Sequence, residues 1–256
     1  MVDVARRPLS FGPVVVIGGG CYGSYYVRQL QRAAAAGAVA IDDLIVVDRD
    51  PRCTVAEQGG AADSPLRPRV GGSEWTPYLD GFLSRAAEAP AAVAADAIVP
   101  SPLMPHLVYQ WLVVRVQQAS PGRAIRQVPL GSELPVPWQR AGEDGTHYAS
   151  FATWMCPINC VEPARCPHTK GPRDWTMPAA LEEFVAGARR SGRDVAGPYV
   201  FHCTHRAYGV GMIDVAPVVE ADADLRARAS RGAVDAIVGT VSHCHGAVGR
   251  LLVDPP

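Results

Sequence analysis

The chain has 256 residues, enough for one large α/β domain or two small ones with a substantial core. The hydrophobic content of 48% and the charged content of 19% are typical of a soluble globular protein. The formal net charge is −1, which gives no reason to expect nucleic acid or an anionic membrane as a partner. The N-terminus has two arginines but no apolar region of a signal peptide, and prolines interrupt the most apolar long stretch, residues 97–114. We therefore expect a cytoplasmic protein.

The first predicted element is a buried strand that runs into a glycine-rich loop. Residues 13–28 read PVVVIGGGCYGSYYVR, in which β-branched residues at 14–17 favour a parallel strand. Gly18, Gly20 and Gly23 follow in G-x-G-x-x-G spacing, and residues 22–36 are predicted to be helical. Gly18 would allow the tight turn, Gly20 the close approach of a pyrophosphate, and Gly23 the packing of the helix on the strand.

A second predicted strand, residues 44–47, ends at Asp48. With this acid in place, the segment from Val14 to Asp48 resembles the Rossmann NAD(P)-binding superfamily. The resemblance implies a doubly wound, mostly parallel α/β sheet with helices on both faces, and a dinucleotide on the loop. Its expected cofactor contacts are Gly18, Gly20, Cys21, Tyr22, Gly23 and Asp48.

The cofactor expected from this resemblance is NAD, because Asp48 would repel the 2′-phosphate of NADP. Arg49 directly after it leaves NADP open. A loop for S-adenosylmethionine is the nearest competitor, although no acid precedes the first glycine. FAD is disfavoured because the chain is short for a flavoprotein with its own substrate domain.

The rest of the first half predicts a short strand near 66–70, a helix over 75–87, a strand at 97–99 and a helix from Pro105 through Val116. Ser101, in the Pro-Ser-Pro step after the strand at 97–99, is a further candidate cofactor contact. A loop over 131–146, rich in Pro, Gly and charge, marks the change between halves. We predict a dinucleotide-binding half at 1–119 and a Cys/His-rich half at 120–256 that packs on or extends the same sheet.

The most unusual chemistry lies in residues 154–175, which read WMCPINCVEPARCPHTKGPRDW. The prolines exclude a regular helix or strand, so a bound metal centre could compensate for the missing backbone pairing. Cys156, Cys160, Cys166 and His168 are the candidate ligands, of either an iron–sulfur cluster or a tetrahedral zinc ion. The spacing C-x3-C-x5-C-P matches no familiar cluster signature, so a reactive thiol and simply packed cysteines stay open.

Two more predicted strands, 199–201 and 234–241, end in runs of histidine and cysteine. Ligands of parallel α/β sheets lie at the carboxyl ends of strands, so His205, His243 and His245 are candidate general acids or bases. If strand-like alternation continued, His243 and His245 would point the same way and could grip one ion.

These features favour an NAD(P)-dependent oxidoreductase with a Cys/His-rich metal, iron–sulfur or thiol site that acts on a small-molecule substrate. The alternative is a non-catalytic module that senses NAD(H), redox state or metal and acts through a partner or an oligomer interface. A role in metal handling rests on analogy alone. Edge strands of such folds often pair two copies, so a homodimer is one expected assembly.

Overall fold

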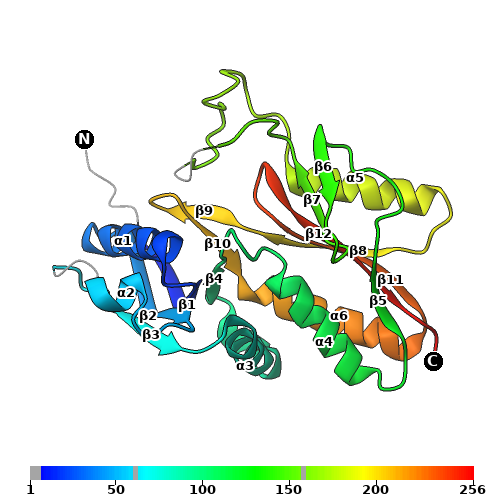
Figure 1. Cartoon of the computed structure of the whole chain (residues 1–256), viewed down its shortest axis with the longest axis horizontal. Helices are drawn as coiled ribbons and strands as arrows, with labels where there is room; N and C mark the ends of the chain where they lie inside the picture. Colours follow the sequence, from blue (N-terminus) through cyan, green and yellow to red (C-terminus); the bar gives the residue numbers. More distant parts are fainter. Residues whose placement is uncertain (1–6, 60–62, 157–159) are drawn as a thin grey trace. The chain divides into compact units, whose positions relative to one another are not determined.

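A computed structural model describes residues 7–59, 63–156 and 160–256 of the chain. The protein is a mixed α/β structure with two sheets, and it divides into two compact units (Figure 1). Unit 1 comprises the chain up to Leu103 together with Thr204–Ala216, and unit 2 comprises Met104–Cys203 and Pro217–Pro256. The sequence placed the change between halves later, at residues 119 and 120. In the described part of the chain, no helix is both long and apolar enough to cross a membrane.

The sheet of unit 1 has the strand order β3-β2-β1-β4-β10-β9. Its first four strands are mutually parallel, whereas β10 runs antiparallel to β4 and to β9. The strands are β1 (Leu9–Ile17), β2 (Val39–Asp48), β3 (Pro68–Gly72), β4 (Ala97–Val99), β9 (Thr204–Ala207) and β10 (Val210–Asp214).

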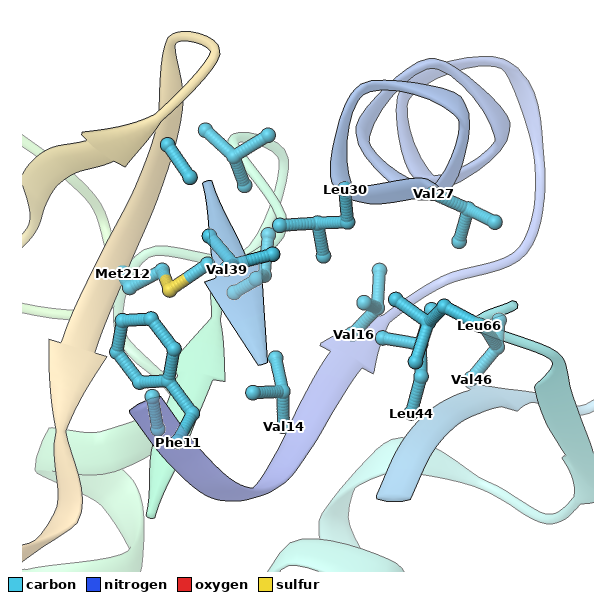
Figure 2. Close-up of a cluster of buried hydrophobic side chains, with 14 of the residues drawn as sticks. Phe11, Val14, Val16, Val27, Leu30, Val39, Leu44, Val46, Leu66 and Met212 are labelled. Atoms are coloured by element: carbon cyan, nitrogen blue, oxygen red, sulfur yellow. The ribbon is translucent and has the colours of Figure 1, made fainter. Parts of the chain in front are cut away.

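Helices connect the parallel strands of unit 1. Helix α1 (Cys21–Ala35) joins β1 to β2, the short α2 (Thr54–Gln58) joins β2 to β3, and α3 (Trp75–Glu88) with a 3-10 turn at Pro90–Val93 joins β3 to β4. Residues 14–17 of β1 are all buried, as expected for a parallel strand covered on both faces. Val27 and Leu30 of α1 and Val16 of β1 belong to one buried cluster (Figure 2). The central strand and the helix after it therefore follow the sequence prediction.

The sheet of unit 2 has the order β6-β7-β12-β11-β8, and β5 also pairs with β12. Only β8 and β11 are parallel among these pairs in the described residues. The strands are β5 (Ile125–Val128), β6 (Trp138–Ala141), β7 (His147–Ser150), β8 (Ala196–His202), β11 (Val234–Val241) and β12 (His245–Val253). The two strands predicted at 199–201 and 234–241 do lie side by side, in a sheet separate from that of the glycine loop.

Close packing against helices explains two glycines in this second sheet. A Cβ on Gly239 of β11 would lie 2.5 Å from Leu181 of α5 (Met177–Arg190). On β12, a Cβ on Gly249 would lie 2.5 Å from the ring of Tyr109 in α4 (Leu107–Ala119). Thr176 Oγ1 accepts a 3.0 Å hydrogen bond from Ala179 N, which confirms the predicted N-cap of α5.

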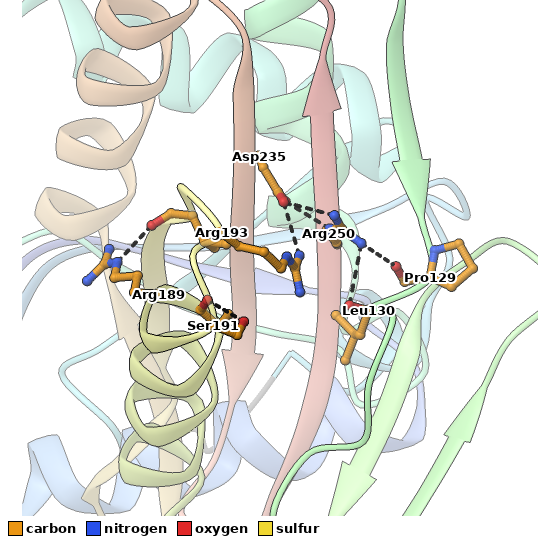
Figure 3. A network of polar contacts seen from close by, with 9 residues as sticks. Pro129, Leu130, Arg189, Ser191, Arg193, Asp235 and Arg250 are labelled. Atoms are coloured by element: carbon orange, nitrogen blue, oxygen red, sulfur yellow. Dashed lines mark hydrogen bonds and ion pairs between the residues drawn. The ribbon is translucent and has the colours of Figure 1, made fainter.

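Two ion-pair networks tie the elements of unit 2 together. Arg250 of β12 donates two 2.8 Å hydrogen bonds to Asp235 of β11, and Arg193 donates a third at 3.0 Å (Figure 3). The second network joins α4 to α6 (Val215–Arg231), where Asp222 is fully buried. Arg115 donates to both of its oxygens at 3.3 and 3.2 Å, and Arg226 lies 3.2 Å away.

Candidate functional site

The glycine loop of unit 1 is fixed to the end of β2 by its backbone. Gly18 has φ of +89°, a left-handed conformation that suits glycine, and its N–H donates to Val47 O at 2.8 Å. The N–H of Gly19 donates to Asp48 Oδ2 at 2.7 Å, and Val55 N donates to Gly19 O at 3.0 Å. The loop and the acid that the sequence singled out are therefore direct neighbours.

Gly23 and Gly20 have different structural reasons to be glycine. A Cβ on Gly23 would collide with the carbonyl oxygen of Gly18, so the close approach of α1 to the loop requires glycine there. A Cβ on Gly20 would meet nothing within 4 Å. The fold therefore does not require glycine at Gly20, and the space above this residue is open to a ligand.

The remaining predicted contacts of unit 1 follow strands β1 and β4 of the same sheet. Cys21 and Tyr22 begin α1 and are exposed, and the first turn of this helix contains no acidic side chain. Ser101 is buried just after β4, where its Oγ accepts a 3.3 Å hydrogen bond from Leu103 N. Since β1, β2 and β4 are parallel, their carboxyl ends, which carry these residues, lie at one edge of the sheet.

In unit 2, the segment 154–175, called the cysteine segment below, folds against the turn between β11 and β12. Three residues before the segment, Phe151 N donates to Cys244 O at 2.8 Å, and two residues after it Met177 N donates to His243 O at 2.9 Å. In between, the Glu162 carboxylate accepts from Ser242 Oγ at 2.7 Å, His243 N at 3.0 Å and Cys244 N at 3.2 Å. The turn is thus held by the residues that flank the segment and by Glu162 inside it.

In this arrangement the Cys156 thiol interacts electrostatically with three other cysteines, namely Cys160, Cys166 and Cys244. Burial raises the pKa of the Cys156 thiol, and the neighbouring Cys160 and Cys166 raise it further. Burial also raises the pKa of Cys244 to about 11, where Glu162 and Cys156 add to the effect while Trp175 and Arg173 oppose it. No disulfide joins any of the seven cysteines, all of which lie in described parts of the chain.

Cys166 is the thiol best prepared to be a thiolate. The backbone N–H of Thr169 lowers its pKa to about 7, assisted by the Thr169 hydroxyl, the N–H of His168 and the charge of Arg173, although burial works against them. Its backbone closes a tight turn, because Cys166 N donates to Gly171 O at 3.0 Å and Lys170 N donates to Cys166 O at 2.9 Å. A thiolate stabilised in this way is the form of cysteine that binds metals.

The fourth predicted ligand, His168, is exposed and stacks on Trp154, with the ring centroids 4.3 Å apart and the planes at 8°. No group of three or more His, Cys, Asp or Glu side chains within residues 7–59, 63–156 and 160–256 is arranged to hold a metal ion. Within the described residues, the thiols are therefore not gathered around a single ion.

The three candidate acid/base histidines lie in different units. His205 is in β9 of unit 1, whereas in unit 2 His243 is in the β11–β12 turn and His245 is the first residue of β12. The alternation expected for His243 and His245 is wrong, because the strand ends at Val241 and the chain reverses through a turn in which Ser242 N donates to His245 O at 2.7 Å. The ring of His243 instead lies near that of His202, with centroids 6.5 Å apart.

The sequence did not identify Glu162 as the link between the cysteine segment and the turn, nor Cys244 as a neighbour of the segment's thiols. The position of Glu162 among three cysteines was the one sequence feature that could have drawn attention to it. Its hydrogen-bond partners could not be predicted, because they are about 80 residues away along the chain. Cys244 was noted at a strand end, and only the antiparallel return of β12 places it against the segment.

One comparison with known proteins identifies a family. A model of the family AF_1314_C, described as "Uncharacterized protein, C-terminal domain", matches residues 108–254, more than half of the chain. The chain belongs to this family. The AF_1314_C match includes the cysteine segment and Cys244, whereas the glycine loop lies outside it. No curated protein and no solved structure matches the chain.

Proposed function

We propose that the protein is an NAD(P)-dependent oxidoreductase whose unit 1 binds the dinucleotide at the glycine loop. The observation that carries the proposal is the position of this loop. It follows the central strand β1 of a parallel β3-β2-β1-β4 array and is hydrogen-bonded to Asp48 at the end of β2. Ligands of open α/β sheets bind at the carboxyl ends of the strands, where this loop lies.

The strand order also supports a Rossmann-like, doubly wound arrangement for the parallel part of unit 1. In the Rossmann fold the first three strands have the order 3-2-1, and the fourth lies on the other side of the first. Unit 1 has this order, with α1, α2 and α3 in the connections, and then departs from it at the antiparallel strands β10 and β9.

The residues of the loop fit a dinucleotide. The open space at Gly20 would admit a pyrophosphate, whose charge the N-terminus of α1 would favour. Each oxygen of Asp48 accepts one backbone hydrogen bond, from Gly19 at 2.7 Å and from Asp50 at 2.9 Å. A carboxylate oxygen can accept more than one hydrogen bond, so Asp48 can also accept the ribose hydroxyls of NAD. Its negative charge disfavours the 2′-phosphate of NADP.

Bound nicotinamide would supply or accept a hydride, and the protein would orient it and move the accompanying proton. His205 lies in unit 1 with the loop and is the candidate for that proton transfer, because imidazole titrates near neutral pH, whereas His243 and His245 belong to unit 2. The thiols of unit 2, with an iron–sulfur cluster or zinc as the candidate cofactor, give the same protein a second place for redox or metal chemistry.

A calorimetric titration of the full chain with NADH, NADPH, FAD and S-adenosylmethionine tests the proposal. We expect NADH to bind most tightly of the four. The variant Asp48→Asn should have a smaller difference between its affinities for NADH and NADPH than the wild type. Tighter binding of S-adenosylmethionine, or no binding of either nicotinamide nucleotide, would contradict it. Binding of NADH without oxidation in the presence of any of a panel of small carbonyl substrates would favour the sensing alternative over catalysis.

A further inference from the structure

We infer that Trp75 is a further residue of the nucleotide site and that its indole N–H donates a hydrogen bond to the adenosine half of the bound dinucleotide. The inference rests on the proposed function, because it names a contact within the same site. The contacts expected from sequence lie in the glycine loop, at the start of α1, and at Asp48 and Ser101, so Trp75 is an addition to them.

The first argument is the position of Trp75 beside the first glycine of the loop. Trp75 is the first residue of α3. A Cβ on Gly18 would lie 3.6 Å from Cζ2 of the Trp75 ring, which is an ordinary van der Waals distance. In an indole, Cζ2 is two bonds away from Nε1. The edge of the ring that carries the N–H therefore lies toward the glycine loop.

The second argument is that this N–H has no acceptor. Nε1 of Trp75 is buried and has no hydrogen-bond partner among the residues that the structure describes, although the side chain as a whole is only partly buried. Buried indole N–H groups usually have a partner, because an unpaired buried donor costs free energy. A ligand beside the loop would supply the missing acceptor once the partly exposed ring turns its nitrogen toward it.

The third argument is that packing in the core does not account for Trp75. Leu79 and Leu83, four and eight residues later, lie on the same face of α3 and are 2% and 0% exposed. The apolar core of unit 1 therefore covers this face from Leu79 onward. Trp75 lies one turn earlier, where the face is only partly covered and the indole reaches the loop.

The adenosine half is selected by the side of the loop on which Trp75 lies. In the order β3-β2-β1-β4, Trp75 follows β3 and Asp48 ends β2, whereas Ser101 follows β4 on the other side of β1. Ser73 N donates to Asp48 O at 3.0 Å, which fixes the start of α3 to the end of β2. Asp48 is the proposed acceptor of the ribose hydroxyls of adenosine. A ribose oxygen or an adenine nitrogen is therefore the acceptor of the indole N–H.

The test is a calorimetric titration of full-length wild type and Trp75→Phe with NADH and with ADP. Phenylalanine keeps an aromatic ring but has no N–H. We expect Trp75→Phe to bind NADH at least about threefold more weakly than wild type. The same factor should apply to ADP, which has the adenosine half without nicotinamide. The matched control Trp138→Phe, the same change at an exposed indole of β6, should bind both as wild type does.

Photolabelling of the wild-type chain keeps the inference testable if Trp75→Phe does not fold. The probe is an ADP that carries an azide on its adenine ring, which reacts with the groups that surround the base. Mass spectrometry should find the label on the peptide that contains Trp75, and an excess of NADH should prevent the labelling.

An unchanged affinity for ADP in a folded Trp75→Phe protein would overturn the inference, because a purely structural tryptophan would lower the melting temperature and leave the affinity unchanged. A loss confined to NADH, or labelling confined to other peptides, would also overturn it. In each case binding of NADH by the wild type would leave the proposed function standing. Absence of NADH binding by the wild type would contradict the proposed function, and this inference with it.

Discussion

Glu162 accepts a 3.2 Å hydrogen bond from the backbone N–H of Cys244, although the two residues are 82 positions apart in the chain. The same carboxylate accepts from Ser242 Oγ and His243 N. A single side chain of the cysteine segment therefore satisfies three donors of the β11–β12 turn. This link joins an irregular segment, which cannot stabilise itself by regular backbone pairing, to the sheet of unit 2.

Replacing Glu162 with glutamine should destabilise unit 2. The amide cannot accept at both of its ends, so at least one partly buried donor loses its partner, at a cost of about 1–2 kcal/mol. Urea unfolding followed by tryptophan fluorescence would measure the loss. The exposed Glu183 of α5 gives a matched control, and Glu183→Gln should change stability by no more than about 0.5 kcal/mol. Equal stability of the two variants would show that the Glu162 contacts contribute nothing.

Gly23→Ala should destabilise unit 1, because its Cβ would collide with the Gly18 carbonyl oxygen. Overpacking of this kind costs about 1–3 kcal/mol, and more when the obstacle is backbone. Gly81→Ala in α3 is the control, since its Cβ would meet only the far end of Arg85 at 3.4 Å. Helix propensity predicts that Gly81→Ala is neutral or stabilising by up to about 1 kcal/mol. Thermal unfolding of both variants provides the measurement, and a melting temperature of Gly23→Ala at or above that of Gly81→Ala would contradict the prediction.

Asp235 should contribute a pH-dependent share of stability. Burial raises its pKa, but hydrogen bonds from Arg250 and Arg193 outweigh burial and hold the pKa below its ordinary value of 3.8. The contribution is therefore complete above pH 3.8 and is lost as the pH falls through the lower, folded pKa.

Asp235→Asn should accordingly lower the free energy of unfolding at pH 7 by about 2 kcal/mol, because two partly buried arginines lose their counter-charge. The difference from wild type should shrink as the pH falls below 3.8. Denaturant titrations at pH 7 and at the lowest pH where both proteins stay folded provide the check. A difference that does not depend on pH would rule out the ionic explanation.

Removing only the Arg115 partner of the buried Asp222 carboxylate should destabilise the protein more than removing both residues of the pair. Arg115→Met leaves Asp222 buried with only the less favourable Arg226 contact, and we expect a loss of about 3 kcal/mol. The double change Arg115→Met with Asp222→Leu should recover part of that loss. A double variant less stable than Arg115→Met would contradict this account of the network.

Local patterns sufficed for the elements around the glycine loop. The apolar run of β1, the helix after Gly20 and the acid at Asp48 lie close together in the sequence. Their structures could therefore be predicted from local patterns, without knowledge of the tertiary fold. Hairpin strands were harder to predict. The glycine-containing turn at Tyr208 and Gly209, which both have positive φ, can be predicted from the sequence, but strands β9 and β10 on either side of it are too short to give a clear pattern.

The environment of the cysteine segment could not be predicted for a different reason. The segment has little regular secondary structure, and its hydrogen-bond partners lie in the turn between β11 and β12. The spacing of Cys156, Cys160 and Cys166 along the sequence therefore carries no information about the position of Cys244. The missing information was tertiary: Phe151, Glu162 and Met177 each contact the same turn. The second half also does not extend the parallel sheet of the first, because the strands of unit 2 form a sheet of their own in which, among the described residues, only β8 and β11 pair in parallel.

The affinity of Gly20→Ala for NADH, compared with wild type and with Gly81→Ala, tests the central claim most directly. The Gly20 backbone has φ of −75° and space for a Cβ, so the variant should fold with an unchanged melting temperature. If a pyrophosphate approaches the loop there, the added methyl should weaken NADH binding at least tenfold, about 1.4 kcal/mol by calorimetry. Gly81→Ala should bind as wild type does. Undiminished NADH affinity in a folded Gly20→Ala protein would show that the glycine loop is not the nucleotide site.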